Sequence, residues 1–476
     1  MRKTKIVCTM GPNEDNIELL LKIAEKMDVA RFNFSHGTHE EQRARLQLLR
    51  EARETTGRPI AALLDTKGPE IRTGLLKDHQ KVMLETGSSF VLTTEACEGT
   101  KEKVYINYAG LNEDVKSGDT ILIDDGLIGL SVREVAGPEI RCTVTNGGEL
   151  GERKGVNVPN VQIRLPGLTD KDKEDIRFGI EEGFDFVAAS FVRNAETIRE
   201  IRKLIEDGGS HMQIIAKIEN QEGLDNLDEI IEAADGIMVA RGDLGVEIDA
   251  KRLPQLQKEI IAKCNYEGKI VITATQMLDS MIRNPRPTRA EVTDVANAVY
   301  NGTDAVMLSG ETAAGKYPLE ALEMMASIVE YTENFLNYHQ FKTREVDKNI
   351  YRNVSNAVCA AAVTTASELK ARAIVVPTFS GSTARLISKY RPKTDILATS
   401  PSQGTARQMM LLWGVNPVWG RMADSTDELF STSISDLKEK GLIAEGDICV
   451  ITAGVKNRLK SMEKSPATNL MRVMEV

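Results

Sequence analysis

Short apolar runs alternate with amphipathic helical stretches along most of the chain. Eight runs have the length and composition of buried β-strands, and they cover residues 5–10, 29–34, 60–65, 186–191, 214–219, 236–241, 270–275 and 305–309. Segments with apolar positions at helical spacing follow, among them residues 40–55, 195–206, 224–234, 253–267, 289–300 and 318–335. Eight strand-helix units predict an α/β fold, a (β/α)8 TIM barrel, because eight parallel strands can close without leaving a free edge.

One interval interrupts this alternation. After Asp65 the expected helix is delayed until residues 170–182, and the intervening residues contain turn sequences such as Ser117-Gly118-Asp119 between short alternating runs. We therefore expect an inserted all-β domain, a small β-barrel, at residues 70–166, and the (β/α)8 barrel at residues 1–69 and 167–340. An insertion after the C-terminal end of a barrel strand lies over the ligand-binding face, so the inserted domain is predicted to act as a lid.

A third region begins near residue 341, after a polar link that contains residues 342–345. A long Ala-rich helix at 353–370 precedes strands at 373–377, 396–399 and 448–452, with helices between them. This order predicts a separate open α/β domain at residues 341–476.

Composition is that of a globular enzyme with a large core. The chain has 476 residues, 41% of them hydrophobic, and a net charge of −10, which argues against general nucleic-acid binding and against attachment to anionic membranes. No apolar run approaches the ~20 residues needed to span a bilayer, and the first residues lead directly into a strand, so we expect a cytoplasmic protein. The six cysteines form no CxxC pair, which predicts free buried thiols.

Polar residues gather at the C-terminal ends of the predicted barrel strands. They lie in the segments 31–37 and 65–72 and at Lys217, Glu219, Arg241, Asp243, Thr273, Thr275, Ser309 and Glu311. Because side chains alternate along a strand, Lys217 and Glu219 point the same way, and the next strand brings Asp243 close to them. Charges clustered at one rim are costly unless a ligand binds there, so we predict a site for a metal and a phosphate or enolate.

The donor types narrow the choice of metal. Carboxylate oxygens without cysteine or paired histidine favour Mg²⁺ or Mn²⁺, and Glu219 with Asp243 is the natural ligand pair. A second set of oxygen-bearing side chains could instead hold a monovalent cation, and it consists of Asn33, Ser35, Asp65 and Thr66.

Two motifs have plainer interpretations than the ones they first suggest. Residues 310–316 match the P-loop pattern GxxxxGK, but Tyr317 stands where Ser or Thr would reach Mg²⁺, so we expect a turn before a helix that begins near Pro318. His36 and His39 have a spacing that suits a helical metal pair, although a solvated turn or helix start is the commoner arrangement.

Longer motifs, in a fixed order, resemble the pyruvate kinase family. They are KIVCTMGP (5–12), RFNFSHG (31–37), LDTKGPEIRTG (64–74), RKGVNVP (153–159), KIENQEG (217–223), MVARGDLGVEI (238–248), ATQMLDSMIRNPRPTRAE (274–291) and DVANAVYNGTDAVMLSGETAAGKYP (294–318). The resemblance covers the barrel and the edges of the insertion, and more loosely the third domain, and it is to the bacterial type without a C-terminal extension. It implies a glycolytic enzyme that transfers a phosphoryl group from phosphoenolpyruvate to ADP, giving ATP and pyruvate.

The resemblance also implies roles for the residues at the rim. Lys217 would balance charge on the transferring phosphoryl group and on the enolate oxygen, while Arg31 and Arg72 would contact the substrate as further cations. Glu219 and Asp243 would hold Mg²⁺, and the backbone N–H groups near Gly242 and Asp243 suit the substrate carboxylate. Thr275 matches the position beside the carbon that must be protonated, and we expect it to orient a water rather than to serve as the only donor.

Further ligand contacts follow from the same resemblance. Nucleotide contacts fall on Asn33, His36, Arg72 and Lys154, and a potassium site falls on Asn33, Ser35, Asp65 and Thr66. Glu70 is the residue type of potassium-dependent members, since a lysine there would supply the charge itself. Lys154 lies on the returning edge of the lid, so lid closure would couple nucleotide binding to the exclusion of water.

The third domain carries a candidate effector loop. Thr378, Ser380, Gly381, Ser382 and Thr383 follow a strand and open a helix, which on its own indicates a helix cap. In the family the segment matches an effector phosphate loop, implying a sugar-phosphate or nucleotide activator. Residues 453–469 depart from the family pattern, which leaves the identity and the existence of the effector open. A homotetramer is implied by the resemblance alone.

Two other functions stay open on the sequence. A barrel lyase or aldolase acting on a pyruvate enolate would share Glu219 and Asp243 but would need neither the insertion nor Lys154. A catalytically silent metabolite sensor would act through the third domain, but the intact set Lys217, Glu219, Asp243 and Thr275 argues against it.

Overall fold

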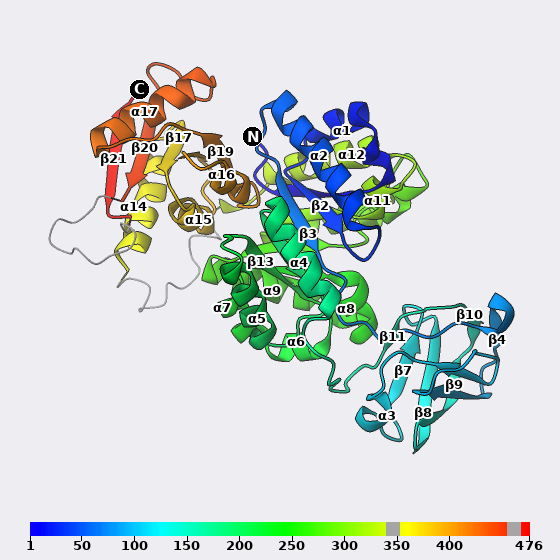
Figure 1. Ribbon diagram of the computed structural model, residues 1–476. Helices are drawn as coiled ribbons and strands as arrows, with labels where there is room; N and C mark the ends of the chain where they lie inside the picture. Colours follow the sequence, from blue (N-terminus) through cyan, green and yellow to red (C-terminus); the bar gives the residue numbers. More distant parts are fainter. Residues whose placement is uncertain (339–352, 455–467) are drawn as a thin grey trace.

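The computed structural model describes residues 1–338, 353–454 and 468–476, and the chain folds into a barrel with one domain on either side (Figure 1). Eight parallel strands close the barrel, and they are β1 (Lys5–Met10), β2 (Val29–Asn33), β3 (Ala61–Asp65), β12 (Phe186–Ala189), β13 (Gln213–Ile218), β14 (Gly236–Ala240), β15 (Ile270–Ala274) and β16 (Ala305–Leu308). The prediction of a (β/α)8 barrel is confirmed, and every predicted strand is present with its ends displaced by at most two residues.

Helices surround this barrel. They are α1 (Ile17–Ala24), α2 (His39–Thr56), α4 (Asp170–Glu182), α5 (Ala195–Asp207), α6 (Gln221–Asp225), α7 (Leu227–Ala233), α8 (Arg241–Glu247), α9 (Leu253–Glu267), α10 (Arg289–Asn301), α11 (Gly310–Ala313) and α12 (Pro318–Glu333), with short 3-10 turns at Pro12–Asp15, Ala250–Arg252 and Asp279–Ile282. The predicted helix 224–234 is split at Asn226, which ends α6 and caps α7. The turn before Pro318 is confirmed, since α12 begins at that residue.

Local sequence explains where several of these helices begin. Thr38, Thr169 and Thr288 cap α2, α4 and α10, and in each case the acidic residue three positions later bonds back to the cap. His39 is therefore the first residue of α2, and its Nε2 lies 2.7 Å from Asp175 Oδ1 on α4, which favours the helix-start interpretation over a metal pair.

The N-terminal rim of the barrel repeats one contact four times. An aspartate directly precedes every second barrel strand, and the four are Asp28, Asp185, Asp235 and Asp304. Each carboxylate accepts the backbone N–H of the second residue of the neighbouring strand, over 2.8 to 2.9 Å, at Ile6, Ala62, Ile214 and Val271. These carboxylates satisfy donors at the strand starts that would otherwise be buried without a partner.

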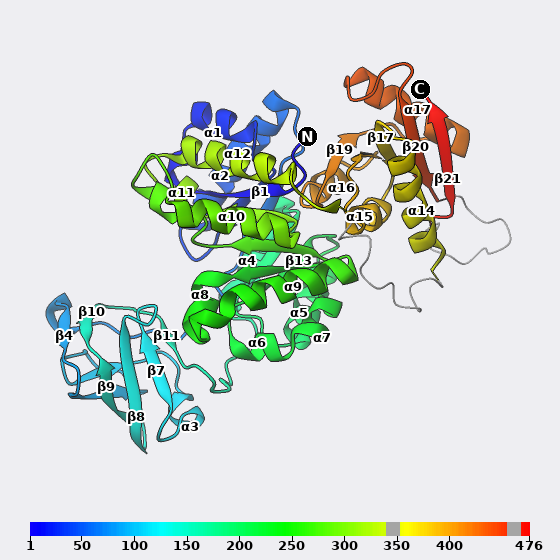
Figure 2. The ribbon, with the colours of Figure 1, turned by 180° about the vertical axis from the view of Figure 1, so that it is seen from behind.

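The C-terminal domain docks on this rim. Arg391 and Arg407 reach Asp304 and Asp185 with ion pairs of 2.9 and 2.8 Å, and Arg385 donates to the carbonyl of Asp235 over 3.0 Å. Figures 1 and 2 show this domain and the inserted β domain on opposite sides of the barrel. The lid side therefore corresponds to the C-terminal ends of the strands, where TIM barrels bind ligands.

The inserted domain is all-β, as predicted, with its own hydrophobic core. Its elements are β4 (Val82–Leu84), β5 (Ser89–Thr93), β6 (Lys103–Tyr105), α3 (Leu111–Asp114), β7 (Thr120–Ile123), β8 (Ile128–Ala136), β9 (Glu139–Asn146), β10 (Gly148–Leu150) and β11 (Val156–Asn157), with a 3-10 turn at Lys77–His79. Six strands pair in the order β11-β7-β8-β9-β5-β6. Arg72 bridges Gly155 beside β11 and Thr73 bridges Ile106 beside β6, so one segment joins both edges of the sheet into a small barrel.

The C-terminal domain is an open α/β domain. Its elements are α14 (Val354–Glu368), β17 (Ala373–Pro377), α15 (Ser382–Lys389), β18 (Asp395–Ser400), α16 (Gln403–Met409), β19 (Val415–Trp419), α17 (Thr426–Glu439), β20 (Ile448–Ala453) and β21 (Leu470–Glu475). The sheet order is β19-β18-β17-β20-β21, with β21 antiparallel to β20. Sequence reasoning missed the two edge strands, and Pro417 inside β19 is the kind of interruption that edge strands tolerate. The predicted polar link at 342–345 lies outside the described residues.

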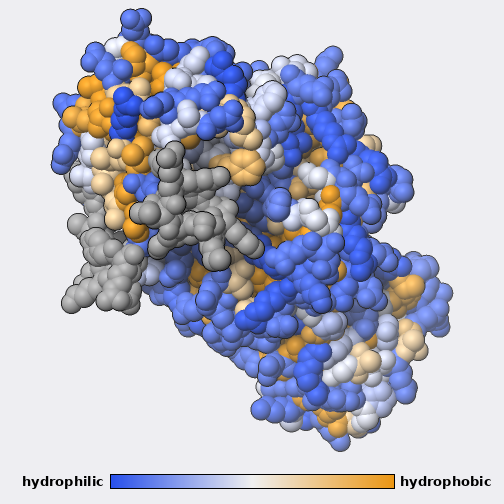
Figure 3. Space-filling view, turned by 60° about the vertical axis from the view of Figure 1, so that its left-hand side comes forward, coloured by the Kyte–Doolittle hydropathy of each residue, from blue (hydrophilic) through white to orange (hydrophobic). Residues whose placement is uncertain are grey.

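The surface is mainly hydrophilic on the face drawn in Figure 3, with hydrophobic side chains gathered over the C-terminal domain. Within the described ranges, no helix combines the length and the apolar character needed to cross a bilayer. All six cysteines are free and five are buried as predicted, but Cys97 on the inserted domain is exposed.

Candidate active site

A hydrogen-bonded network of charged side chains fills the C-terminal mouth of the barrel. Lys217 Nζ on β13 lies 3.2 Å from Asp65 Oδ1 and 3.0 Å from Glu219 Oε1. Arg31 Nε on β2 lies 2.6 Å from Asp65 Oδ2. The two carboxylates have only 1% of their side-chain surface exposed. The strand alternation predicted that Lys217 and Glu219 point the same way, and their side chains do meet.

The charges in this network are strongly coupled. Burial opposes the charge of Lys217, but Asp65 and Glu219 outweigh it and hold the lysine pKa above its ordinary value. Burial raises the pKa of Glu219 to about 7, with Lys217 opposing and Asp243 reinforcing the shift. Burial likewise raises the pKa of Asp243, with Lys217 and the neighbouring Glu219 opposing the shift. Two neighbouring carboxyl groups, one buried and one half-buried, are a favourable place for a divalent cation, which would relieve their repulsion.

Two hydroxyl groups complete the network, and sequence reasoning missed both. Ser190 Oγ accepts a hydrogen bond from Lys217 Nζ over 2.7 Å and donates to the carbonyl of Thr66 over 2.6 Å. Thr9 Oγ1 accepts from Arg31 Nη1 over 2.9 Å. Ser190 lies two positions beyond the buried Ala188, so the alternation that pointed to Lys217 would also have found it. A neutral hydroxyl at a strand end indicates a ligand site less strongly than a charged side chain does.

Thr275, at the end of β15, has a strained backbone. Its φ of 68° lies in the left-handed region, which β-branched residues rarely adopt. The Thr275 hydroxyl donates to the carbonyl of Ala274 over 2.6 Å and accepts from the backbone N–H of Gly242 over 2.8 Å. The N–H that we expected to face a substrate carboxylate is therefore already bonded to the Thr275 hydroxyl.

Arg241 does not share the mouth with Lys217, contrary to our expectation that it would lie on this rim. Its guanidinium lies 2.6 Å from a carboxylate oxygen of Asp294 on α10, and it donates to the carbonyl of Thr275 over 2.6 Å. Arg241 is the first residue of α8, so it turns into the packing between helices instead of facing the mouth. Thr273 and Glu311, also predicted at the rim, are buried and bond to Thr303 and to the backbone of Ser309.

The loop after β2 is held firmly by its neighbours. Gln42 Nε2 donates to the carbonyls of Asn33 and His36 over 3.1 and 2.9 Å, and Lys171 Nζ donates to that of Phe34 over 3.0 Å. This loop carries the predicted nucleotide contacts Asn33 and His36, so these residues are presented on a fixed backbone.

The four candidate ligands for a monovalent cation come from two adjacent strand ends. Asn33 and Asp65 are paired in the β2–β3 register, and Ser35 and Thr66 follow them. Asn33 Oδ1 accepts the N–H of Ser35 over 3.1 Å, and Thr66 Oγ1 accepts the N–H of Ser190 over 3.1 Å. The structure thus gathers oxygen donors at one edge of the mouth, beside Asp65.

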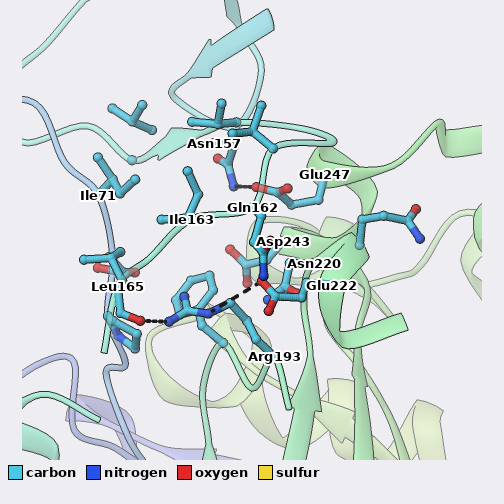
Figure 4. A pocket seen from close by; sticks show the side chains of 18 of the residues that line it. Ile71, Asn157, Gln162, Ile163, Leu165, Arg193, Asn220, Glu222, Asp243 and Glu247 are labelled. Carbon is cyan, nitrogen blue, oxygen red and sulfur yellow. Dashed lines mark hydrogen bonds and ion pairs between the residues drawn. The ribbon is translucent and has the colours of Figure 1, made fainter. Parts of the chain in front are cut away.

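A cavity of about 710 Å³ lies between the inserted domain and the barrel (Figure 4). Arg72, Lys154 and Asp124 line it from the inserted domain, and Asp243 and Glu247 line it from α8. The two lid cations are paired within the lid region, Arg72 with Glu70 at 2.6 Å and Lys154 with Asp124 at 3.0 Å. They would have to exchange these partners to reach a ligand deeper in the mouth.

The candidate effector loop lies between β17 and α15. Gly381, with a φ of 78°, caps α15 and donates its N–H to Thr378 Oγ1 over 3.0 Å. Ser380 and Ser382 are exposed and their hydroxyls lie 3.1 Å apart, whereas Thr383 is buried against Thr468. The motif departures at residues 455–467 lie outside the described residues.

Comparison with known proteins places the chain in a family. A model of the pyruvate kinase barrel domain matches residues 1–322, and a model of the pyruvate kinase alpha/beta domain matches residues 356–474. A pyruvate kinase from Clostridium acetobutylicum is 50% identical over 479 residues, covering all of both chains, and one from Staphylococcus epidermidis is 50% identical over 99% of this chain and 80% of its own. A crystal structure of a pyruvate kinase from Cryptosporidium parvum superposes with a TM-score of 0.93 at 39% identity, covering 100% of this chain and 96% of that one. The chain therefore belongs to the pyruvate kinase family.

Proposed function

We propose that this protein transfers the phosphoryl group of phosphoenolpyruvate to ADP, giving ATP and pyruvate in glycolysis. The observation that carries the proposal is the buried Lys217, held as a cation between Asp65 and Glu219 at the mouth of the barrel. A fixed cation in a dry site stabilises charge on a transferring phosphoryl group at no cost of reorganisation. Family membership across both matched domains supports the same reaction.

In this proposal the substrate lies above Lys217. Lys217 neutralises the phosphoryl oxygens and then the enolate oxygen left on the three-carbon fragment, and Arg31 contacts the phosphoryl group from β2. Asp65 bonds to both cations and orients them, while Ser190 fixes the position of the ammonium group. The Thr275 hydroxyl orients a water for protonation of the enolate carbon, within a backbone geometry that Arg241 stabilises.

Magnesium or manganese is the divalent cofactor that fits. The neighbouring Glu219 and Asp243 carboxyls would supply two oxygen ligands, and the described residues contain no group of three His, Cys, Asp or Glu side chains able to hold a metal alone. The remaining ligands would be substrate oxygens and water. Such a cation supplies electrostatic stabilisation of the phosphoryl group and the enolate when bound.

The nucleotide is proposed to lie between the β2 loop and the lid. Asn33 and His36 contact it from the barrel, and Arg72 and Lys154 contact it from the inserted domain. Because Lys154 is paired with Asp124, nucleotide phosphates would replace that carboxylate as its partner. The lid would then exclude water from the transfer.

A coupled assay tests the reaction. Pyruvate is detected with lactate dehydrogenase as the loss of NADH absorbance, with phosphoenolpyruvate and ADP supplied together or singly. We expect pyruvate and ATP to form in equal amounts, and only when both substrates and Mg²⁺ are present. Pyruvate released without ADP would instead favour the lyase or aldolase.

Potassium dependence is the first prediction. Asn33, Ser35, Asp65 and Thr66 are the proposed ligands, and turnover in a buffer of tetramethylammonium salts at equal ionic strength should fall by about tenfold or more. The Glu70→Lys variant is the control, since its ammonium group would replace the charge of the ion and remove the dependence. Equal turnover of the unmodified protein with and without K⁺ would contradict the prediction.

Regulation and assembly complete the proposal. A phosphorylated metabolite, a sugar phosphate or a nucleotide, is proposed to bind at Thr378, Ser380, Gly381, Ser382 and Thr383, and steady-state kinetics with a panel of such compounds would test it.

We further propose a cytoplasmic homotetramer. Its domains would be residues 1–69 with 167–340, residues 70–166, and residues 341–476. Sedimentation velocity would test the oligomeric state.

A further inference from the structure

The lid is attached to the barrel by a side-chain contact in addition to its two covalent connections. Asn157 Nδ2 on β11 donates to Glu247 Oε1 on α8 over 2.7 Å, between residues 90 positions apart (Figure 4). The Asn157 side chain therefore links the inserted domain directly to a carboxylate of the barrel.

Glu247 connects the position of the lid to that of Asp243. It lies four residues after Asp243 on the same helix, so both side chains project from one face of α8, and both line the cavity. Glu247 is half-buried, and burial raises its pKa, with the hydrogen bond from Asn157 opposing that shift. A half-buried acid keeps its place when a hydrogen bond satisfies it, and here the lid supplies the donor, Asn157 Nδ2.

On the lid side of this contact, Asn157 is close in sequence and in hydrogen bonding to the two lid cations, Lys154 and Arg72. Lys154 is three residues before Asn157, and Gly155 between them bridges Arg72. The N–H of Thr73 donates to the carbonyl of Lys154 over 2.9 Å, so these short segments move as one piece. Fixing Asn157 therefore fixes Lys154 and Arg72 as well.

We propose that Glu247 is a positioning residue that acts through Asn157: it holds lid strand β11, and with it Lys154 and Arg72, at a set place relative to Asp243. The lid would thus take its position from the helix that carries a proposed metal ligand. The kinetic part of this inference rests on the proposed function, whereas the mechanical part does not.

A label on the lid provides a readout independent of turnover. Cys97 is the exposed cysteine of the inserted domain and the other five are buried, so a maleimide dye on the folded protein should react there. The decay of dye anisotropy then reports the motion of the lid relative to the barrel. Asn157→Asp places two carboxylates against each other, and Asn157→Asp combined with Glu247→Gln restores a hydrogen bond with donor and acceptor exchanged.

We expect Asn157→Asp to speed the anisotropy decay and to raise the KM for ADP by about tenfold or more, because a hydrogen bond to a charged group is lost. The double variant should return both quantities to within about twofold of the unmodified protein. Gln80→Glu makes the same charge change at an exposed site of the inserted domain that does not line the cavity, and it should leave both quantities unchanged.

The inference is overturned if Asn157→Asp leaves the anisotropy decay unchanged, or if the double variant fails to restore it. A failure of the proposed function is a different result, because then the unmodified protein would form no pyruvate from phosphoenolpyruvate and ADP. The anisotropy comparison still decides the positioning role in that case.

Discussion

Lys217→Met is expected to lower kcat by about a thousandfold while the protein keeps its fold. Methionine matches the length and packing of lysine but carries no charge, so the variant removes the cation that would face the phosphoryl group and the enolate. Asp65 would keep Arg31 as a partner at 2.6 Å, which limits the damage to the network. The coupled assay at saturating substrates measures the loss.

Lys5→Met is the matched control for this change. Lys5 is also a buried lysine of a barrel strand, but it lies at the opposite end of the barrel, where its ammonium donates to the carbonyl of Val415. The same chemical change there should affect stability and leave kcat near its normal value. Near-normal turnover in Lys217→Met, or an equal loss in both variants, would refute the role given to Lys217.

Hydrophobic periodicity was sufficient to predict the barrel. Its strands are apolar on both faces and lie between amphipathic helices, so their number and order are visible in the sequence. The edge strands β19 and β21 were not predicted, since β19 contains Pro417 and β21 has no buried position. Edge strands are half solvated, and their residue patterns are correspondingly weak.

The candidate site could be predicted in part. Lys217 and Glu219 were found because their charges interrupt an apolar strand, and alternation gave their direction. The direction of Arg241 was predicted wrongly, because it begins a helix whose rotation depends on partners elsewhere, above all Asp294. Contacts between distant segments, such as Asn157 with Glu247, leave no pattern in one sequence.

The aspartates of the N-terminal rim show a pattern that could have been recognised. Every second barrel strand is directly preceded by an aspartate, and these are Asp28, Asp185, Asp235 and Asp304. Their spacing relative to the strands is therefore regular. Their carboxylates bond across to the neighbouring strand, so the repeat spans pairs of strand-helix units. Charges at this end of a TIM barrel indicate stability, in contrast to those at the mouth.

Asp304→Asn should destabilise the protein by about 3–5 kcal/mol. Asp304 and Arg391 have only 5% and 3% of their side-chain surface exposed, and they form an ion pair of 2.9 Å between the barrel and the C-terminal domain. An amide cannot neutralise the guanidinium, and Arg391 would remain charged, buried and beside Trp413. Urea unfolding followed by tryptophan fluorescence would measure the shift of the first transition, since a chain of several domains need not unfold in one step.

Two further variants test whether the loss of stability in Asp304→Asn comes from the unpaired charge of Arg391. Asp228→Asn removes the carboxylate of an exposed pair with Lys263 and should change stability by less than about 0.5 kcal/mol. Asp304→Asn combined with Arg391→Met should recover much of the loss, because no buried cation is left unpaired and the amide oxygen can still accept the N–H of Val271. If the single Asp304→Asn change were as mild as Asp228→Asn, the ion pair would not be what secures the C-terminal domain to the barrel.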